Sequence, residues 1–205
     1  MLDDCSRRRL GARIYPSESL LACLGFLPRA FLAHGLPLRL CVDCRSFFLS
    51  PVPDALAQLG TALHFYGVTF RDASSPQARG KIERSHQDWQ NRLPALCAAE
   101  AIASIEPANA LLENLCTHRD THERHRELAM TPLAAWLPAK RENRSALRPA
   151  PKCPWWRHVF SQRSTVKVQP DGRVAAGSAH LRVCAPPGTP SSTASTPMAT
   201  SPSSA

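Results

Sequence analysis

The sequence predicts an α/β fold that is followed by a small β-rich module. Short apolar runs alternate with helix-length segments over roughly the first hundred residues, and the composition then changes near Trp155. The chain has 205 residues, of which 43% are hydrophobic, and this is sufficient for one core and a smaller unit. We expect four parts: a partial core with trailing helices at 1–137, a linker at 138–154, a β module at 155–184 and a disordered tail at 185–205.

The first elements are a strand and a helix. Residues 8–15 alternate between apolar and polar side chains, which predicts a strand that Pro16 ends. Residues 17–19 read Ser-Glu-Ser and offer an N-cap for a helix that runs to about Ala33. Gly35 then closes that helix.

The next segments continue the alternation. Residues 38–42 are an apolar run that predicts a buried strand, with Asp43 at its carboxyl end. Open α/β sheets bind ligands at that end of their strands. The following pattern predicts, in order, a helix at 54–63, a strand at 65–70, a loop at 71–79 and a helix at 81–96.

One carboxylate stands among cations at the start of that last helix. Pro76 and Gly80 are helix breakers, so Glu83 is expected close to the helix N-terminus, where the macrodipole favours an anion. Three cations surround it in the sequence: Arg79, Lys81 and Arg84. A lone acid among bases beside a loop indicates a metal-holding carboxylate on a DNA-facing surface. A solvated helix start is the alternative interpretation.

The charge of the chain indicates a polyanionic partner. The formal net charge is +9, and the bases cluster at four places: 7–9, 79–84, 118–126 and 140–148. The mostly apolar stretch 20–40 contains charged residues and prolines, which excludes a membrane span. Asp3 and Asp4 stand where a signal peptide needs positive charge, so we expect a cytoplasmic protein.

Histidines and cysteines leave a metal interpretation open. Residues 95–115 predict two packed helices interrupted by Pro107, and residues 117–136 carry three histidines among arginines. A basic helix that faces DNA or solvent explains that second stretch better than a metal does. Cys41 and Cys44 form a CxxC pair without a nearby second pair, so buried strand cysteines are favoured over a zinc-stabilised structure.

The C-terminal part reads as a β module and a tail. Residues 165–168 and 173–183 alternate around a Pro-Asp-Gly turn at 170–172, which predicts two strands. Trp155 and Trp156 could stack on DNA, but anchoring a small core is the favoured role. The residues beyond 184 are mostly Pro, Ser, Thr and Ala, which predicts disorder.

Three segments, in this order, resemble the insertion-sequence transposases and integrases. Asp-Asp-Cys-Ser-Arg at 3–7 is similar to the family's hairpin turn, residues 35–43 are similar to its second acidic strand, and 76–84 to its acidic helix. The C-terminal order resembles the small barrel that follows the core in many transposases. The resemblance implies a ribonuclease-H-like integrase core lacking its first strand, followed by helices and a small C-terminal β-barrel-like module.

The resemblance also implies a chemistry. Family members transfer DNA strands with two Mg²⁺ ions, or Mn²⁺, held by three acids. Asp43 matches the second acid and Glu83 the third, so both are candidate catalytic residues and metal ligands. The cations Arg79, Lys81 and Arg84 would then bind DNA, both the element ends and the target, in the bacterial nucleoid.

The first acid of the family lies on a strand before the hairpin, and here the hairpin starts at Asp3. We therefore expect an N-terminally truncated and inactive fragment, in which Asp3 and Asp4 form the turn rather than replace the missing ligand. An unpaired strand edge would favour a homo-oligomer. The alternative is a non-catalytic, nucleic-acid-binding relic of a transposase.

Overall fold

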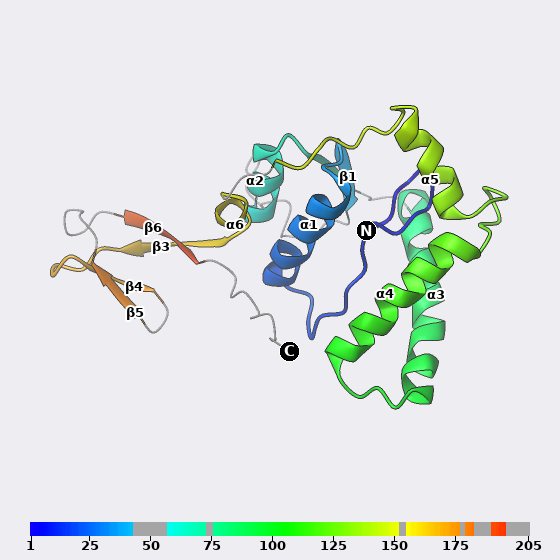
Figure 1. The fold of residues 1–205 in the computed structure, drawn as a ribbon. Helices are drawn as coiled ribbons and strands as arrows, with labels where there is room; N and C mark the ends of the chain where they lie inside the picture. The colour runs from blue at the N-terminus through cyan, green and yellow to red at the C-terminus, as the bar shows by residue number, and fades with distance from the viewer. Residues whose placement is uncertain (43–56, 73–75, 152–154, 177–178, 183–189, 196–205) are drawn as a thin grey trace.

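Two parallel strands and two helices hold the main core of the molecule (Figure 1). The structure is a computed structural model, and it describes residues 1–42, 57–72, 76–151, 155–176, 179–182 and 190–195. The elements of this part are α1 (Leu20–His34), β1 (Arg39–Val42), α2 (Gln58–Phe65) and β2 (Thr69–Asp72). Strand β1 pairs with β2 in parallel, in a register that joins Arg39 to Thr69 and Val42 to Asp72. The strand predicted at 65–70 therefore begins later, because α2 continues to Phe65.

Both ends of α1 follow the local signals in the sequence. The hydroxyl of Ser19 accepts a hydrogen bond of 3.2 Å from the backbone nitrogen of Ala22, as an N-cap does. At the other end Gly35 has a φ of 104°, and its N–H donates to the carbonyl of Phe31. The predicted boundaries of this helix are confirmed, and so is the existence of the short strand that follows it. Its predicted burial is wrong, because the residues of β1 alternate between exposed and half-buried.

The main core joins α1 and α2 to a short helix far along the chain. Helix α6 (Trp156–Val159) brings Trp156 to 4.5 Å from the ring of Tyr66 and 6.5 Å from that of Phe31, measured between ring centroids. Trp156 is buried, whereas Trp155 is 64% exposed. The anchoring role is therefore confirmed for Trp156 alone, and the core that it anchors is the main one. The buried members of this cluster are Leu24, Leu27, Phe31, Leu36, Leu59, Ala62, Leu63, Val68, Trp156 and Phe160.

Three helices form the second part: α3 (Pro76–Ala99), α4 (Ile105–His122) and α5 (Pro132–Arg141). Helix α3 starts at Pro76, inside the predicted loop, because proline is tolerated in the first turn of a helix. For the same reason Pro107 does not interrupt α4, where it lies in the first turn; the break falls at 100–104, where Ala101 has a positive φ. Helix α5 extends to Arg141, within the range predicted as a linker.

Residues 8–15 do not form the predicted strand. The structure has only an isolated bridge between Leu2 and Arg9, which closes the predicted hairpin turn. Side chains of α4 replace a neighbouring strand as hydrogen-bond partners of this segment. Asn109 accepts from the N–H of Ile14 at 2.7 Å and donates to its carbonyl at 3.1 Å, while Asp120 accepts from the N–H of Arg9 at 3.1 Å. The backbone groups of Arg9 and Ile14 therefore have side-chain hydrogen-bond partners in place of a neighbouring strand.

Replacement of Asn109 by alanine is expected to destabilise the fold by about 1–3 kcal/mol, because both backbone groups of Ile14 lose their side-chain partner. Asn109 is buried, so water compensates poorly. Urea unfolding followed by circular dichroism measures the change. The exposed Asn91 on α3 is the matched control, and Asn91→Ala should shift stability by less than about 0.5 kcal/mol. Equal effects of the two substitutions would contradict the assignment.

Arg148 connects the segment that follows α5 to the first part of the fold. Its backbone bonds in both directions with Leu36, at 2.7 and 2.9 Å. Its guanidinium donates to the carbonyls of Tyr66 at 2.8 Å and Gly67 at 2.9 Å. A Cβ on Gly35 would lie 2.7 Å from the carbonyl oxygen of Arg148, so this contact requires glycine at position 35.

The C-terminal strands extend away from the helices in Figure 1. Strand β3 (Gln162–Lys167) pairs antiparallel with β6 (Pro190–Ser195), and β4 (Arg173–Ala176) pairs antiparallel with β5 (Ala179–Arg182). The predicted turn at 170–172 is present, and the N–H of Gln169 donates to the carbonyl of Arg173 across it at 2.8 Å. The single strand predicted at 173–183 is wrong, because β4 and β5 divide this range and pair with each other. Strand β6 falls within the range predicted to be disordered; backbone pairing does not depend on the polar composition of its side chains.

The mixture of helices and strands agrees with the predicted α/β class. The strands of the C-terminal part, as far as the structure describes them, lie in two separate two-stranded sheets. Within the described ranges, the helices are too short or too polar to cross a bilayer.

Candidate nucleic-acid interface

Of the two predicted acids, the structure describes Glu83, which lies on α3. Asp43 lies outside the described residues, but the residue before it, Val42, pairs with Asp72 at the carboxyl end of both strands. Helix α3 begins at Pro76, soon after Asp72. Glu83 lies in the third turn of this helix and is exposed. Its predicted place in the first turn is therefore wrong, and the macrodipole has little effect on it.

Asp3 and Asp4 are engaged in the hairpin rather than in a ligand set. One carboxylate oxygen of Asp3 accepts from both the N–H and the hydroxyl of Ser6, each at 2.7 Å. Asp4 accepts a hydrogen bond of 2.6 Å from Lys81 and lies 3.6 Å from Arg7. The predicted turn role is thus confirmed for both acids.

The described residues do not gather into a metal site. Nowhere in the described ranges do three histidine, cysteine or acidic side chains come together as such a site requires. Glu83 is an exposed carboxylate on α3. Cys41 is exposed on β1, so the expectation of a buried strand cysteine is wrong at this position, and Cys44 lies outside the described residues.

Lys81 and Arg84 lie on a different face of α3 from Glu83. At 3.6 residues per turn, Lys81, Arg84, Ser85 and Asp88 share one face, and Glu83 points to the opposite side. The shared face contacts the N-terminal hairpin through the bond from Lys81 to Asp4 and the bond from Arg9 to Ser85, at 3.0 Å. The sequence cluster around Glu83 therefore divides into two surfaces. Arg79 lies in the first turn of α3, and the structure describes only its backbone.

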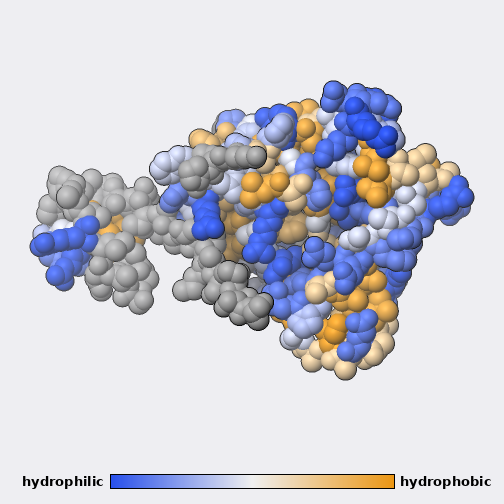
Figure 2. Space-filling view, in the orientation of Figure 1, coloured by the Kyte–Doolittle hydropathy of each residue, from blue (hydrophilic) through white to orange (hydrophobic). Residues whose placement is uncertain are grey.

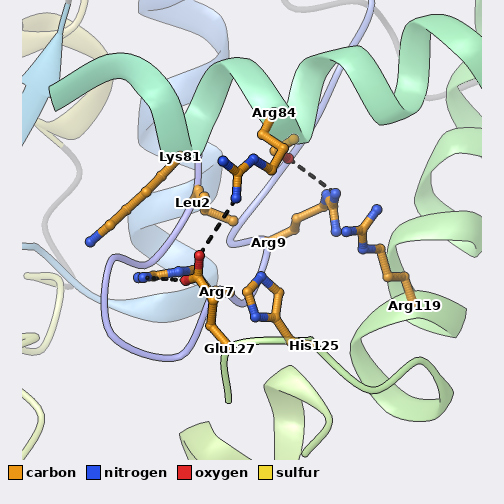
Figure 3. Close-up of a pocket in the computed structure, with 9 residues that line it drawn as sticks. Leu2, Arg7, Arg9, Lys81, Arg84, Arg119, His125 and Glu127 are labelled. Carbon is orange, nitrogen blue, oxygen red and sulfur yellow. Dashed lines mark hydrogen bonds and ion pairs between the residues drawn. The ribbon is translucent and has the colours of Figure 1, made fainter. Parts of the chain in front are cut away.

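The face of α3 that carries Lys81 forms a small pocket with the hairpin and the end of α4 (Figure 3). We call it the basic pocket. Lys81 and Arg84 enter it from the helix, Arg7 and Arg9 from the hairpin segment. Its lining residues are Leu2, Arg7, Arg9, Lys81, Arg84, Ser85, Arg119, His125 and Glu127. Five cations thus surround one carboxylate, that of Glu127. Figure 2 shows mostly hydrophilic residues where the N-terminal segment meets α3 and α4, and a hydrophobic area near the α3–α4 connection.

Arg9 forms the floor of the pocket. Its side chain is only 5% exposed, and the guanidinium lies 4.4 Å from the ring centre of the buried Trp89. One of its nitrogens donates to Ser85, and another group, Nε, has no hydrogen-bond partner among the described atoms. Burial, followed by the charge of Arg119, lowers the pKa of Arg9 to about 10. Arg9 therefore stays charged at neutral pH in a partly desolvated site.

Acids pair with the cations of the pocket and with Arg8 beside it. Glu127 lies 3.3 Å from Arg7 and 3.5 Å from Arg84, and the hydrogen bond from Arg7 lowers its pKa. Asp88 pairs with Arg119 and lies 3.7 Å from Arg9. The buried Asp120 lies 3.7 Å from Arg8, and desolvation raises its pKa.

The sequence indicated only part of this pocket. Lys81 and Arg84 were predicted to bind DNA, and the basic clusters at 7–9 and 118–126 were visible as charge. Their convergence on one pocket, and the place of Glu127 within it, carried no local signal, because the contacting residues are separated by as many as 120 positions. His118 and His122 stack on each other on the exposed surface of α4, in keeping with a solvated basic helix.

Comparisons with known proteins show relatives for part of the chain. No family model matches. The transposase for insertion sequence IS1202 of Streptococcus pneumoniae is 34% identical over 118 residues, which cover 54% of this chain and 25% of that protein. A transposase homologue of Sinorhizobium fredii, y4bF, is 29% identical over 136 residues, 64% of this chain and 29% of its own length. The chain spans about a quarter of the length of these curated relatives.

Among solved structures, the catalytic core domain of BIV integrase superposes with a TM-score of 0.47 and 20% identity, covering 66% of this chain and 82% of that one. The resemblance to insertion-sequence transposases is confirmed by the two curated relatives.

Proposed function

We propose, from this relationship to insertion-sequence transposases, that the chain binds DNA and derives its architecture from an enzyme of DNA transposition. The observation that carries the proposal is the 34% identity over 118 residues to the IS1202 transposase. The cationic face of α3 supports it, because Lys81 and Arg84 can neutralise backbone phosphates. Arg79 completes the proposed DNA-binding set. The ribonuclease-H-like core and the barrel-like module belong to the same proposal.

The catalytic part of the proposal assigns Asp43 and Glu83 as acids that would hold Mg²⁺ or Mn²⁺. Carboxylate oxygens suit these hard cations. Asp43 follows the carboxyl end of β1, and Glu83 lies in the third turn of α3, the helix that follows β2 in the chain. When bound, such ions stabilise charge on the phosphate oxygens and on the attacking and leaving oxygens. Glu83 would orient one ion from a rigid helix.

A non-catalytic DNA-binding protein is the second candidate function. It is favoured by the engagement of Asp3 with Ser6 and of Asp4 with Lys81, which leaves neither acid placed as a third ligand. We therefore propose that this chain alone binds DNA without completing strand transfer. Association of copies and action on bacterial DNA in the cytoplasm belong to this proposal as well, and sedimentation would measure the association.

Substitution of the two acids separates the candidates. Fluorescence anisotropy with labelled duplex DNA measures binding, and a strand-transfer assay with Mn²⁺ measures turnover. We expect the wild type to bind DNA with an affinity that falls steeply with salt, and to show no transfer. Asp43→Asn and Glu83→Gln should leave binding intact or slightly stronger.

If the wild type transfers strands, and both substitutions abolish transfer while DNA binding is retained, the chain is an enzyme. That result would overturn the proposal of a non-catalytic DNA-binding protein. Absence of salt-sensitive DNA binding would overturn the proposed function as a whole. Glu100→Gln is the control for the charge change, since Glu100 is exposed beyond the far end of α3.

A further inference from the structure

We propose that the basic pocket is a binding site for one phosphodiester group of the DNA backbone, and that Glu127 is a built-in competitor occupying it in the free protein. The inference rests on the proposed DNA-binding function and deepens it. It adds Arg7, Arg9 and Arg119 to the proposed contacts, and it makes Glu127 a residue that limits affinity.

The charges of the pocket favour a further anion. Five cations and the carboxylate of Glu127 line it. Asp4, Asp88 and Glu123 contact those cations from the edge, so the cations exceed the acids that contact them by one. Like charges held close together repel each other, and a bound anion relieves that repulsion.

The buried arginine is the part that makes this a built site rather than a charged surface. Arg9 is held by Trp89 beneath it and by Ser85 beside it, so its orientation is fixed before any ligand arrives. Its Nε has no partner among the described atoms, although its side chain is only 5% exposed. A preorganised, partly desolvated guanidinium loses little entropy on binding and attracts a phosphate more strongly than a surface arginine does.

Glu127 occupies the position of such a phosphate. Its carboxylate bridges Arg7 and Arg84, which come from the hairpin and from α3 (Figure 3). The side chain of Arg84 is 81% exposed and that of Glu127 is 53% exposed, so the ion pair between them is weak, while Arg7 is 14% exposed and holds the other side of the carboxylate. A phosphate can therefore displace the carboxylate and take over both arginines, each of which has a fork suited to two oxygens.

The size of the pocket selects the ligand. Its cavity volume is about 50 Å³, far below the roughly 300 Å³ at which pockets for drug-sized ligands begin. It has room for one phosphate-sized group and none for a base or a nucleoside. Sequence-independent contact with the DNA backbone is the recognition that such a site supports.

Binding of labelled duplex DNA to the full chain tests the proposal. We expect Glu127→Gln to raise the affinity about threefold to fivefold at moderate salt, because the internal competitor loses its charge. The matched control Glu100→Gln changes the net charge equally, away from the pocket, and should raise affinity less than twofold. Arg84→Gln should lower affinity about fivefold, whereas Arg173→Gln, which removes an exposed charge from β4, should change it little.

The outcomes separate this inference from the function on which it rests. If the wild type binds DNA but Glu127→Gln equals Glu100→Gln, the role of Glu127 is overturned while DNA binding stands. If the wild type fails to bind DNA, the proposed function fails first. Calorimetric titration with inorganic phosphate distinguishes the source of the anion: weak phosphate binding beside tight DNA binding supports the proposal, and equally tight binding of both would overturn the assignment to DNA.

Discussion

Replacement of Trp156 by alanine is expected to destabilise the folded chain by about 3–5 kcal/mol, the largest effect of any single change considered. Trp156 is buried between Phe31, Tyr66 and Phe160, so its removal leaves a cavity that helices α1 and α2 cannot fill. Loss of this side chain also detaches α6 and the strands that follow it from the main core. Urea unfolding followed by circular dichroism measures the change.

The neighbouring tryptophan provides a matched control. Trp155 is 64% exposed, and Trp155→Ala should change stability by about 0.5 kcal/mol or less. Trp156→Phe keeps an aromatic ring and removes an indole N–H that has no hydrogen-bond partner among the described atoms, so it should cost less than about 1.5 kcal/mol. A small effect of Trp156→Ala would contradict the packing of α6 against α1 and α2.

Replacement of Asp120 by alanine is expected to destabilise the fold by about 3 kcal/mol. The change removes the acceptor of the Arg9 N–H and leaves Arg8 without its nearest carboxylate. Asp120→Asn keeps an acceptor and removes the buried charge, so it should cost about half as much or less. If alanine and asparagine were equally harmful, the charge rather than the hydrogen bond would dominate this site.

The pH dependence of Asp120 has a definite sign. Burial raises its pKa in the folded chain above the ordinary value of 3.8. Between that value and the raised folded pKa, the folded state binds more protons than the unfolded state. The free energy of unfolding contributed by this group therefore falls as pH rises through that window. Asp120→Asn should remove this component, which urea unfolding at a series of pH values rising from 3.8 would measure.

Local signals predicted much of the first part of the fold. The Ser19 cap and the glycine at position 35 each act within a few residues and appear in the structure as predicted. The apolar run before Asp43 forms the predicted strand, but this strand is half-exposed rather than buried. The predicted start of α3 is wrong because Pro76 and Gly80, which are helix breakers in general, both lie inside this helix. A proline in the first turn loses no hydrogen bond, and one glycine costs a long helix only about 1 kcal/mol.

The candidate site was less predictable for a physical reason. Arg9 reaches Trp89, and Arg7 reaches Glu127, only after α3 and α4 have folded against the hairpin. Residues 8–15 have the alternation of a strand, but Asn109 and Asp120 take the hydrogen bonds that a strand would have supplied. Side chains that are distant in the sequence thus replace a strand as hydrogen-bond partners, and the local pattern of apolar and polar residues does not reveal such a replacement.

The contact of Arg148 with Leu36 also bears on how the chain folds. The two residues are about 110 positions apart, and the three long helices lie between them. Closing a loop of that length costs about 2 kcal/mol more in chain entropy than closing one of ten residues. The hairpin of α3 and α4 can form early from nearer contacts, whereas Arg148 and α6 can dock beside α1 only after the intervening helices have folded. We therefore expect Arg148 and Trp156 to dock slowly and late in folding.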